Sequence, residues 1–586
     1  MRIQPRQELL DLWQATVRLS FRDGEWIAGG NSISDAEQLL CIMAPATQLP
    51  FFRLDRPDAT AGDVAEKLRG IGDGVQIPVR LIRALTAYVD RYTAPDGTPT
   101  FAGGDHFRSD VEGEEVKRAQ RDLDVVDSFA VSVTLMLAAT GFLKNFREVL
   151  RRPASIEQVD RLAGKANRRL TAALTGLLRS FAVNVFPADS DLGRELVRAV
   201  NQERRPARPV VEELRAALRE VNVRLRDDVT IGSGAAGAIE LDYSDFLFEC
   251  GWSWGVVRDA PAIETVAAIG TQKPGVAQNA PYLYFTAVAM DAIQELSSER
   301  TRLLGLLDPE QARLAQSLQL RFELARSYWA TVATFGGGRW PLEDLPWRTT
   351  DGVEADYFSL LVGGMVLQNM QFARTSDGAL RRVAQVFEDI AARGRITRRS
   401  TGPESPFDGR FPLAGSEDVG GPTLVWTVAD LAATLLRRTL QLAAMLTDDG
   451  ARARAIELSD AIWTHLHSRM ITDGPAEVSW YHPKRAVDCL VAAAHLIQET
   501  RPPDGRLGQI AESLLNEAEH LLDRELLDGP TFGGQAMRAE LDQIGVALRR
   551  ARSVLPGRPG VAVAIAEDVL RRLDRLAAAR RGDIGW

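Results

Sequence analysis

The sequence contains few cysteines, no apolar signal core and almost no alternating strand pattern. Cys41, Cys250 and Cys489 are its three cysteines in 586 residues, and they lie far apart in apolar segments. This spacing excludes a disulfide framework and favours reduced, buried thiols. The longest apolar run, residues 129–143, is too short and too rich in hydroxyl groups for a membrane span. We therefore expect a cytoplasmic protein.

Charge of either sign is not concentrated anywhere in the chain. The net charge is -9, from 79 acidic and 70 basic residues. Such a balance favours solubility and argues against a general nucleic-acid-binding surface. The hydrophobic content of 45% and the charged content of 25% are ordinary for a globular protein. At this length we expect two or three domains, or one large closed array.

The signatures of several common enzyme classes are also missing. No two Cys-His elements have the spacing of a zinc site, and the pairs Asp227-Asp228 and Asp448-Asp449 are isolated, unlike the clustered aspartates that bind prenyl diphosphates. Residues 232–237 match the glycine pattern of dinucleotide-binding loops, but no alternating strand and helix units surround them. We expect a linker there, no metal site and no bound cofactor.

Helical periodicity dominates what is present. Leu9, Trp13 and Val17 place one apolar stripe on the first helix. Ser34 and Glu37 have the spacing of a capping box before the apolar run at 39–43, so we expect a helix to begin at Ser34 with Glu37 bonded to its N-terminus. The sequence therefore predicts an all-α protein built from helical hairpins.

Loops rich in glycine and aromatic residues recur along the chain and precede apolar helices. They lie at residues 101–107, 250–255, 335–356, 411–422, 474–483 and, more weakly, 531–535. Their spacing suits repeated units of two or three helices, which must stack on neighbours to bury their apolar faces. We predict an N-terminal helical region at 1–230, a central array at 238–500 and a C-terminal helical region at 501–586.

In its pattern of apolar helices alternating with more charged ones, the central array resembles the α/α toroids of terpene cyclases, protein prenyltransferases and many carbohydrate-active enzymes. The resemblance covers about residues 240–500 and concerns the repeat pattern, not a catalytic motif. It implies an inner and an outer layer of helices, with a ligand site at the end of the ring where the loops gather.

The loop at residues 335–356 carries the densest set of candidate site residues. Three glycines end the preceding helix, and two prolines exclude a new one. The candidate acid/base residues are Glu343, Asp344, Asp351, Glu354, Asp356 and, from a later helix, Asp488. The candidate substrate-binding residues are Trp252, Trp254, Arg339, Trp340, Trp347, Arg348, Trp426, Trp480, His482 and Arg485.

These residue types suit two different functions. Two carboxyl groups, one protonated and one ionised, among aromatic platforms would suit an acid/base enzyme acting on a carbohydrate or isoprenoid-like substrate. The same tryptophans could instead plug the end of a helical core, with the charges paired in water, in a non-catalytic scaffold that binds a protein partner. The C-terminal helices could also mediate homo-oligomerisation. The sequence leaves both readings open.

Overall fold

The computed structural model describes residues 2–226, 243–373, 376–396, 409–472, 481–499, 504–528, 535–555 and 559–580. Helices make up 66% of the chain, which confirms the all-α class. The chain forms two compact units, Met1–Leu496 and Ile497–Trp586. The expected N-terminal region and nearly all of the expected central array therefore share one unit, which contains the candidate site.

A first set of helices in unit 1 forms a series in which each helix packs against the next. The set consists of α2 (Ser32–Gln48), α6 (Val126–Val149), α11 (Leu283–Leu296), α14 (Asp356–Ala373), α16 (Leu431–Met445) and α18 (Tyr481–Glu499). The last step, from α18 to α16, includes the Cys489 thiol, which lies 3.3 Å from the carbonyl oxygen of Ala433. We call this set the lining helices, because all of them contribute to the cavity described below.

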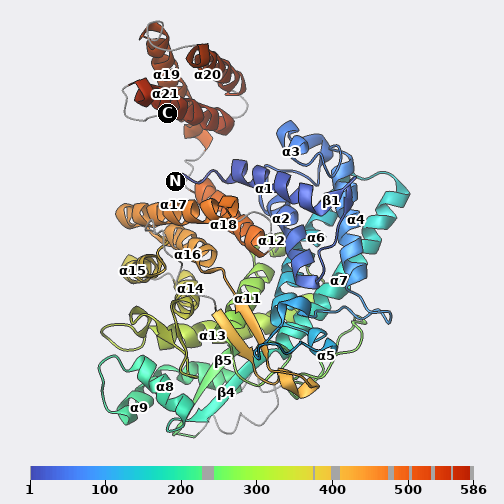
Figure 1. Ribbon diagram of the computed structural model, residues 1–586, viewed down its shortest axis with the longest axis vertical. Coiled ribbons are helices and arrows are strands. Elements are labelled where there is room, and N and C mark those ends of the chain that lie inside the picture. Colours follow the sequence, from blue (N-terminus) through green and yellow to red (C-terminus); the bar gives the residue numbers. More distant parts are fainter. Residues whose placement is uncertain are drawn as a thin grey trace. The chain divides into compact units, whose positions relative to one another are not determined.

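A second set of helices covers the lining helices. It consists of α1 (Pro5–Ser20), α4 (Gln76–Arg91), α7 (Pro153–Arg179), α13 (Pro309–Ala333), α15 (Asp377–Arg393) and α17 (Asp449–Thr472). Figure 1 shows α17 beside α1, although they are far apart in the sequence, and the backbone N–H of Arg2 donates to Asp460 at 2.7 Å. Covering helices and lining helices therefore alternate along the chain, and the last covering helix reaches the segment that leads into the first.

Helix α2 begins two residues before the position that the sequence suggested. Asn31 is its N-cap, and the Asn31 side chain accepts hydrogen bonds from the backbone N–H groups of Ile33 and Ser34 at 3.2 and 2.9 Å. Asparagine competes well with serine as a cap, so the expected capping box of Ser34 and Glu37 is wrong. Glu37 lies one turn inside the helix, where its side chain is buried.

Helix α6 contains the longest apolar run of the chain. Among the described residues it is the one helix long and apolar enough to cross a membrane, but 89% of its most apolar window is buried inside the protein. It packs against α2, α7 and α11. We therefore describe α6 as a core helix of unit 1.

Two seven-residue strands were not anticipated. Strand β4 (Phe181–Pro187) pairs antiparallel with β5 (Phe246–Trp252) along its whole length. All of β5 after Phe246 is buried, so the strand lacks the alternation of apolar and polar residues that identifies strands in a sequence. The sequence therefore shows no alternating pattern for this strand, although the all-α class holds with few and short strands.

The remaining strands are short. Figure 1 shows β4, β5 and the three-stranded sheet of β3, β9 and β8 at the end of unit 1 away from α17 and α18. The short sheets are β1 (Phe21–Arg22) with β2 (Glu25–Trp26), β6 (Trp347–Arg348) with β7 (Glu354–Ala355), and the order β3 (Arg108–Ser109), β9 (Leu424–Val428), β8 (Gly409–Leu413). The short helices are α3 (Gly62–Lys67), α5 (Arg118–Arg121), α8 (Asp191–Val200), α9 (Ala207–Ala217), α10 (Arg219–Arg224) and α12 (Glu299–Leu303).

Aromatic residues of two glycine-rich loops and of strand β9, which follows a third such loop, meet one another. The ring centroid of Phe107 lies 6.3 Å from that of Trp254 and 5.7 Å from that of Trp426. The indole N–H of Trp254 donates to the carbonyl oxygen of Ala414 at 3.0 Å, and Trp254 is completely buried. These loops therefore gather as expected, and their rings pack directly on one another in the core.

Unit 2 is a bundle of α19 (Asp504–Asp528), α20 (Gln535–Val554) and α21 (Pro559–Arg580), each packed against the other two. Its core is small and separate, and includes Leu515, Ile544 and Val569. Arg552 of α20 forms an ion pair with Glu519 of α19 at 2.8 Å. The described residues of unit 2 thus have the apolar layer that an independent unit needs.

The buried indole of Trp254 provides a test of how the loops are held. Replacing Trp254 by phenylalanine retains a buried ring but leaves the carbonyl oxygen of Ala414 without this donor, so we expect a loss of about 1–3 kcal/mol of stability. Urea denaturation followed by circular dichroism measures the change. The control is Leu303→Ala, at a side chain that is 74% exposed and should change stability by less than about 0.5 kcal/mol. An equal effect of both variants would contradict the assigned role of Trp254.

Candidate functional site

The lining helices enclose two adjoining pockets with polar walls. Both are lined by Asp291 of α11, Arg437 of α16, and Arg485 and Asp488 of α18. The first, which we call the tyrosine pocket, also has Tyr284, Tyr357, Asp430, Arg438 and Cys489 in its wall. The second, which we call the glutamate pocket, also has Glu37, Asp127, Thr134, Glu295 and Lys484 in its wall. Together they form the central cavity of unit 1.

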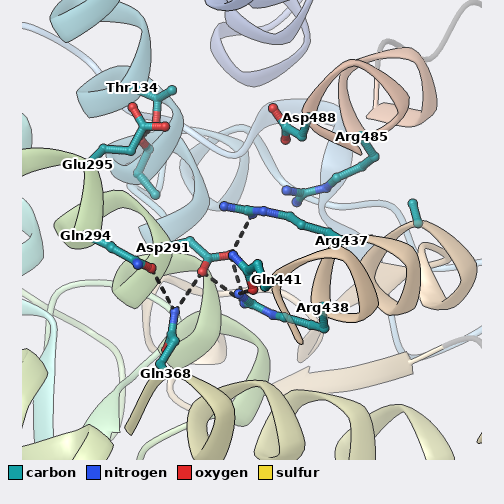
Figure 2. A network of polar contacts seen from close by, with 12 residues as sticks. Thr134, Asp291, Gln294, Glu295, Gln368, Arg437, Arg438, Gln441, Arg485 and Asp488 are labelled. Carbon is teal, nitrogen blue, oxygen red and sulfur yellow. Dashed lines mark hydrogen bonds and ion pairs between the residues drawn. The ribbon is translucent and has the colours of Figure 1, made fainter. Parts of the chain in front are cut away.

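Asp291 lies between the two pockets and holds two arginines. It accepts from Arg437 Nη1 at 2.8 Å, from Arg438 Nη2 at 2.9 and 3.0 Å, and from the amide of Gln368 at 3.1 Å (Figure 2). Burial opposes ionisation of Asp291, but the two guanidinium groups outweigh it and hold the pKa of the carboxyl below its usual value. Asp291 is thus an ionised centre that fixes the positions of both arginines.

Close packing at a glycine allows Arg438 to reach this position. A Cβ atom on Gly364 of α14 would lie 2.8 Å from Arg438 Nε, closer than real side chains approach. The absence of a side chain at the neighbouring Gly363 likewise lets the ring of Phe387 pack against α14. The glycine pair therefore lets α14 come close to α16 and leaves room for a buried guanidinium.

The two tyrosines of the tyrosine pocket each bond to a carboxylate, one in the same pocket and one in the wall of the glutamate pocket. Tyr357 donates to Asp430 at 2.7 Å, and Tyr284 donates to Asp127 at 2.8 Å. Arg485 Nε lies 3.3 Å from the other oxygen of Asp430. Burial is the main cause that raises the pKa of both phenols well above the usual value, and the nearby carboxylates raise it further. Both tyrosines are therefore neutral hydrogen-bond donors.

The glutamate pocket contains Glu37, a carboxyl group that is protonated rather than ionised. The side chain of Glu37 is 3% exposed, and its Oε2 atom has no hydrogen-bond partner among the described residues. Burial raises the pKa of Glu37 to about 8, and the charges of Asp127 and Asp488 add to this, while Arg485 and Lys484 oppose it. Glu37 is therefore mostly protonated at neutral pH.

A second glutamate faces the same space. Burial also raises the pKa of Glu295. The charge of Lys484 lowers this pKa, and the charge of Asp488 raises it further. The amide of Gln48 donates to Glu295 at 3.5 Å, at the limit of a hydrogen bond. Lys484 instead holds Asp488 at 2.6 Å, so the one lysine of the pocket is already engaged.

The cavity is small. The tyrosine pocket measures about 30 Å³ and the glutamate pocket about 50 Å³. On this measure a water molecule needs at least about 10–15 Å³ and two to four polar partners. The charged walls supply such partners, so the space suits a few waters or the polar groups of a small molecule, and does not suit a long apolar chain.

Two of the candidates named from the sequence lie in this cavity. Arg485 and Asp488 are both on α18 and contribute to both pockets. His482 is on the same helix but is exposed, and Trp480 lies outside the described residues. The spacing of three between Arg485 and Asp488 places them on one face of the helix, which is why both reach the cavity.

The tryptophans Trp252, Trp254, Trp347 and Trp426 are all buried, at 0 to 4% exposure, and none lines either pocket. Trp252 donates from its indole to the carbonyl oxygen of Leu177 at 2.9 Å. The backbone N–H of Trp347 donates to Ser359 at 2.7 Å. Trp340 is half-buried, with the guanidinium of Arg382 at 3.7 Å from its ring centroid. The structure brings these rings into the core rather than around an open space.

The charges of the loop at 335–356 pair mainly with arginines. Four carboxyl groups form such pairs: Glu343 with Arg382, Asp344 with Arg339 at 3.5 Å, Glu354 with Arg348 at 2.6 Å, and Asp356 with Arg393 at 2.9 Å. Asp351 bonds to the hydroxyl group of Thr349 within the loop. None of these residues lines either pocket. A catalytic role for them remains a prediction without a cavity to support it.

The residues that sequence reasoning missed are the acidic and basic side chains on the apolar lining helices. They are Glu37, Asp127, Asp291, Glu295, Arg437, Arg438 and Lys484. Two of these residues could have been recognised from the sequence by their apolar neighbours. Asp291 interrupts the apolar run that precedes it in α11, and Asp127 follows two valines at the start of α6. Charged residues are rarely buried without a partner or a function, so a charge within an apolar helix is informative.

The buried carboxyl of Glu37 makes stability depend on pH in a defined direction. Its folded-state pKa of about 8 lies above the usual 4.5, so its contribution to stability is complete below pH 4.5 and is lost as the pH rises to 8. Between pH 5 and 9 the wild type should lose stability relative to Glu37→Gln, by on the order of a few kcal/mol.

Urea denaturation of both proteins at several pH values measures this difference. Glu66→Gln, at an exposed glutamate of α3, is the matched control and should follow the wild type at every pH. Parallel curves for wild type and Glu37→Gln would show that Glu37 is not buried in its neutral form.

Removing Asp291 should be costly, because it would leave Arg437 and Arg438 buried without their shared counterion. We expect Asp291→Ala to destabilise unit 1 by about 3–5 kcal/mol. Asp160→Ala, which breaks an exposed pair with Arg147, should change stability little and serves as the control. Thermal unfolding of both variants checks the expectation, and similar melting temperatures would contradict it.

No curated protein and no solved structure matches the chain. A family model described as SCO2524-like matches residues 1–583. Because this match spans nearly the whole sequence, the chain belongs to the SCO2524-like family.

Proposed function

We propose that unit 1 binds a small, hydroxylated molecule of the carbohydrate class in its central cavity and that Glu37 supplies acid/base chemistry there. The observation that carries this proposal is that a buried, mostly protonated carboxyl group with one unpartnered oxygen, Glu37, lines the same pocket as an ion-paired carboxylate, Asp488. A protonated and an ionised carboxyl side by side are the parts that general acid/base catalysis needs.

The walls of the cavity favour a polar ligand over an isoprenoid-like one. An apolar chain would offer no hydrogen bonds to Glu37, Asp488 or Arg437, so it would leave buried charges without solvent or partner. Hydroxyl groups can both donate and accept, and can therefore replace the waters that such a cavity would otherwise hold. The charged lining supports the carbohydrate part of the sequence-based hypothesis.

We also infer that unit 1 is an α/α toroid whose centre is this cavity. Lining and covering helices alternate along the chain, and Glu37 of α2 lines the same pocket as Lys484 and Arg485 of α18, at the two ends of the series. In such a ring the facing side chains of the inner helices meet at the axis. The buried thiols of Cys41, Cys250 and Cys489 support a reducing, cytoplasmic location.

A panel of neutral polyols and monosaccharides tests the binding proposal on the full chain by thermal shift. A compound present at 100 times its Kd should stabilise the protein by about 2.7 kcal/mol. The shift should disappear in Arg437→Ala and persist in Glu66→Gln. Calorimetric titration of the best compound then measures the affinity. Shifts that survive Arg437→Ala would place binding outside the cavity.

The rival function, a scaffold for a protein partner, has one observation in its favour. Unit 2 exposes apolar side chains on its own helices, with Leu526 at 48%, Leu527 at 82% and Val546 at 57%. Exposed apolar residues of this kind are common at protein interfaces. If no compound of the panel shifts the melting temperature and a defined protein co-purifies in a manner that Leu527→Asp abolishes, the scaffold is the better account.

A further inference from the structure

The central cavity contains more acidic than basic groups. Its acidic groups are Glu37, Asp127, Asp291, Glu295, Asp430 and Asp488, and its basic groups are Arg437, Arg438, Lys484 and Arg485. Each basic group holds a carboxylate: Arg437 and Arg438 hold Asp291, Arg485 holds Asp430, and Lys484 holds Asp488. The excess of acidic groups therefore lies in the carboxyls outside these pairs.

Among the described residues, the carboxyls without an ion pair gather in the glutamate pocket. Glu37 and Glu295 both line it, and Asp127, which bonds to a phenol, lies beside them. Their side chains come from α2, α11 and α6, so they converge from three sides of the pocket. Glu37 lines this space, and its buried Oε2 atom has no hydrogen-bond partner among the described residues, so the carboxyl retains capacity to accept from a group that is not part of the chain.

We propose that the glutamate pocket binds the ammonium group of a small amine-bearing ligand, with Glu37 as its principal counterion. This inference rests on the proposed function, and it names the substrate class as a hydroxylated amine. An ammonium group has three donors, and the pocket offers three acceptor side chains in Glu37, Glu295 and the hydroxyl of Thr134. Figure 2 shows Glu295 and Thr134 close together.

The basic side of the cavity fixes the orientation of such a ligand. Arg437 and Arg485 line both pockets and repel a second positive charge, whereas their guanidinium groups can donate to hydroxyl or carboxylate oxygens. Figure 2 shows Arg437, Arg485 and Asp488 together, on the side of Asp291 away from Gln294 and Gln368. The ammonium group therefore lies toward Glu37 and Glu295, and the oxygen-bearing part of the ligand points toward the arginines.

Binding of an ammonium group is linked to the protonation of Glu37. The free carboxyl is mostly neutral at pH 7, and a neighbouring cation favours its ionised form, so binding releases the Glu37 proton to the solvent. In the complex with an amine, Glu37 is therefore the base of the acid/base chemistry proposed above. The charges that face Glu37 from the elements packed around it are Asp127 of α6 and Lys484, Arg485 and Asp488 of α18. Affinity for an ammonium group should therefore rise with pH up to about pH 8 and then level off.

Ethanolamine and ethylene glycol form a matched pair of probes, because they have similar size and differ in one ammonium group. Calorimetric titration of the full chain at pH 6.5 and 8.5 should show ethanolamine binding at least about tenfold tighter at the higher pH, which corresponds to about 1.4 kcal/mol. Ethylene glycol should show no such dependence. Titration in two buffers of different ionisation heat should count about one proton released at pH 6.5.

Two variants identify the group that responds. Glu37→Gln should weaken ethanolamine binding at least about tenfold at pH 8.5 and remove its pH dependence. Glu249→Gln is the matched control, since Glu249 is also a buried carboxyl, with a pKa raised by burial to about 7, but lies on β5 and does not line either pocket. It should bind ethanolamine like the wild type. Glu295→Gln provides a second cavity variant with an expected weakening.

The outcomes separate this inference from the proposed function. If neutral polyols bind in the cavity but ethanolamine binds no more tightly than ethylene glycol, the ammonium proposal fails and the proposed function stands. If neither neutral nor amine probes bind, both fail. If sodium or potassium chloride alone gives the same Glu37-dependent heat, the pocket is an inorganic cation site and the amine proposal is overturned.

Discussion

The structure of unit 1 depends on how it accommodates charge in the centre of an apolar array. Asp291 and its two arginines are surrounded by helices rich in leucine, alanine and valine, and the desolvation of each ion costs several kcal/mol before pairing. Pairing at 2.8 to 3.0 Å offsets much of that cost only if α11 and α16 keep a fixed distance and rotation. The glycines of α14 make room for this geometry. The ion cluster thus constrains three helices at once.

The arrangement of the covering helices follows from the same constraint. Since the lining helices carry charge on the side facing the cavity, their apolar residues must be buried on the opposite sides, against the covering helices and the aromatic loops. The rings of Phe107, Trp254 and Trp426 provide that burial at one end. Aromatic pairs of this kind add about 0.5–1.5 kcal/mol each beyond the apolar area that they bury. Trp254 and Trp426, which the sequence suggested as substrate-binding residues, therefore pack outside the cavity and support the helices that line it.

Periodicity and loop spacing were enough to predict the helical class, because both depend on local sequence. The cavity could not be found in the same way. Arg485 and Asp488 were identified because they share one helix face, whereas Glu37 was misread as part of a helix cap that Asn31 in fact provides. Whether Glu37 lies near Lys484 depends on contacts between segments more than 400 residues apart, and no local pattern encodes them. Strand β5 escaped detection for a similar reason, since burial on both faces removes its alternation.

Stability alone does not account for a cavity of this kind. Well-packed apolar side chains of similar volume are often as stabilising as a buried ion pair, or more so, and a buried carboxyl without a partner is a direct cost. Unit 1 nevertheless keeps Glu37 and Glu295 in one pocket, with the pKa of both raised by burial. The cluster of Asp291, Arg437 and Arg438 can be understood as a fixed support, because its members satisfy one another. The Oε2 atom of Glu37 has no hydrogen-bond partner among the described residues, and costly groups of this type concentrate where a protein does chemistry or binds a ligand. The buried Glu37 carboxyl with its unpartnered Oε2 atom, more than the number of charges around it, is therefore the feature of unit 1 that stability does not explain.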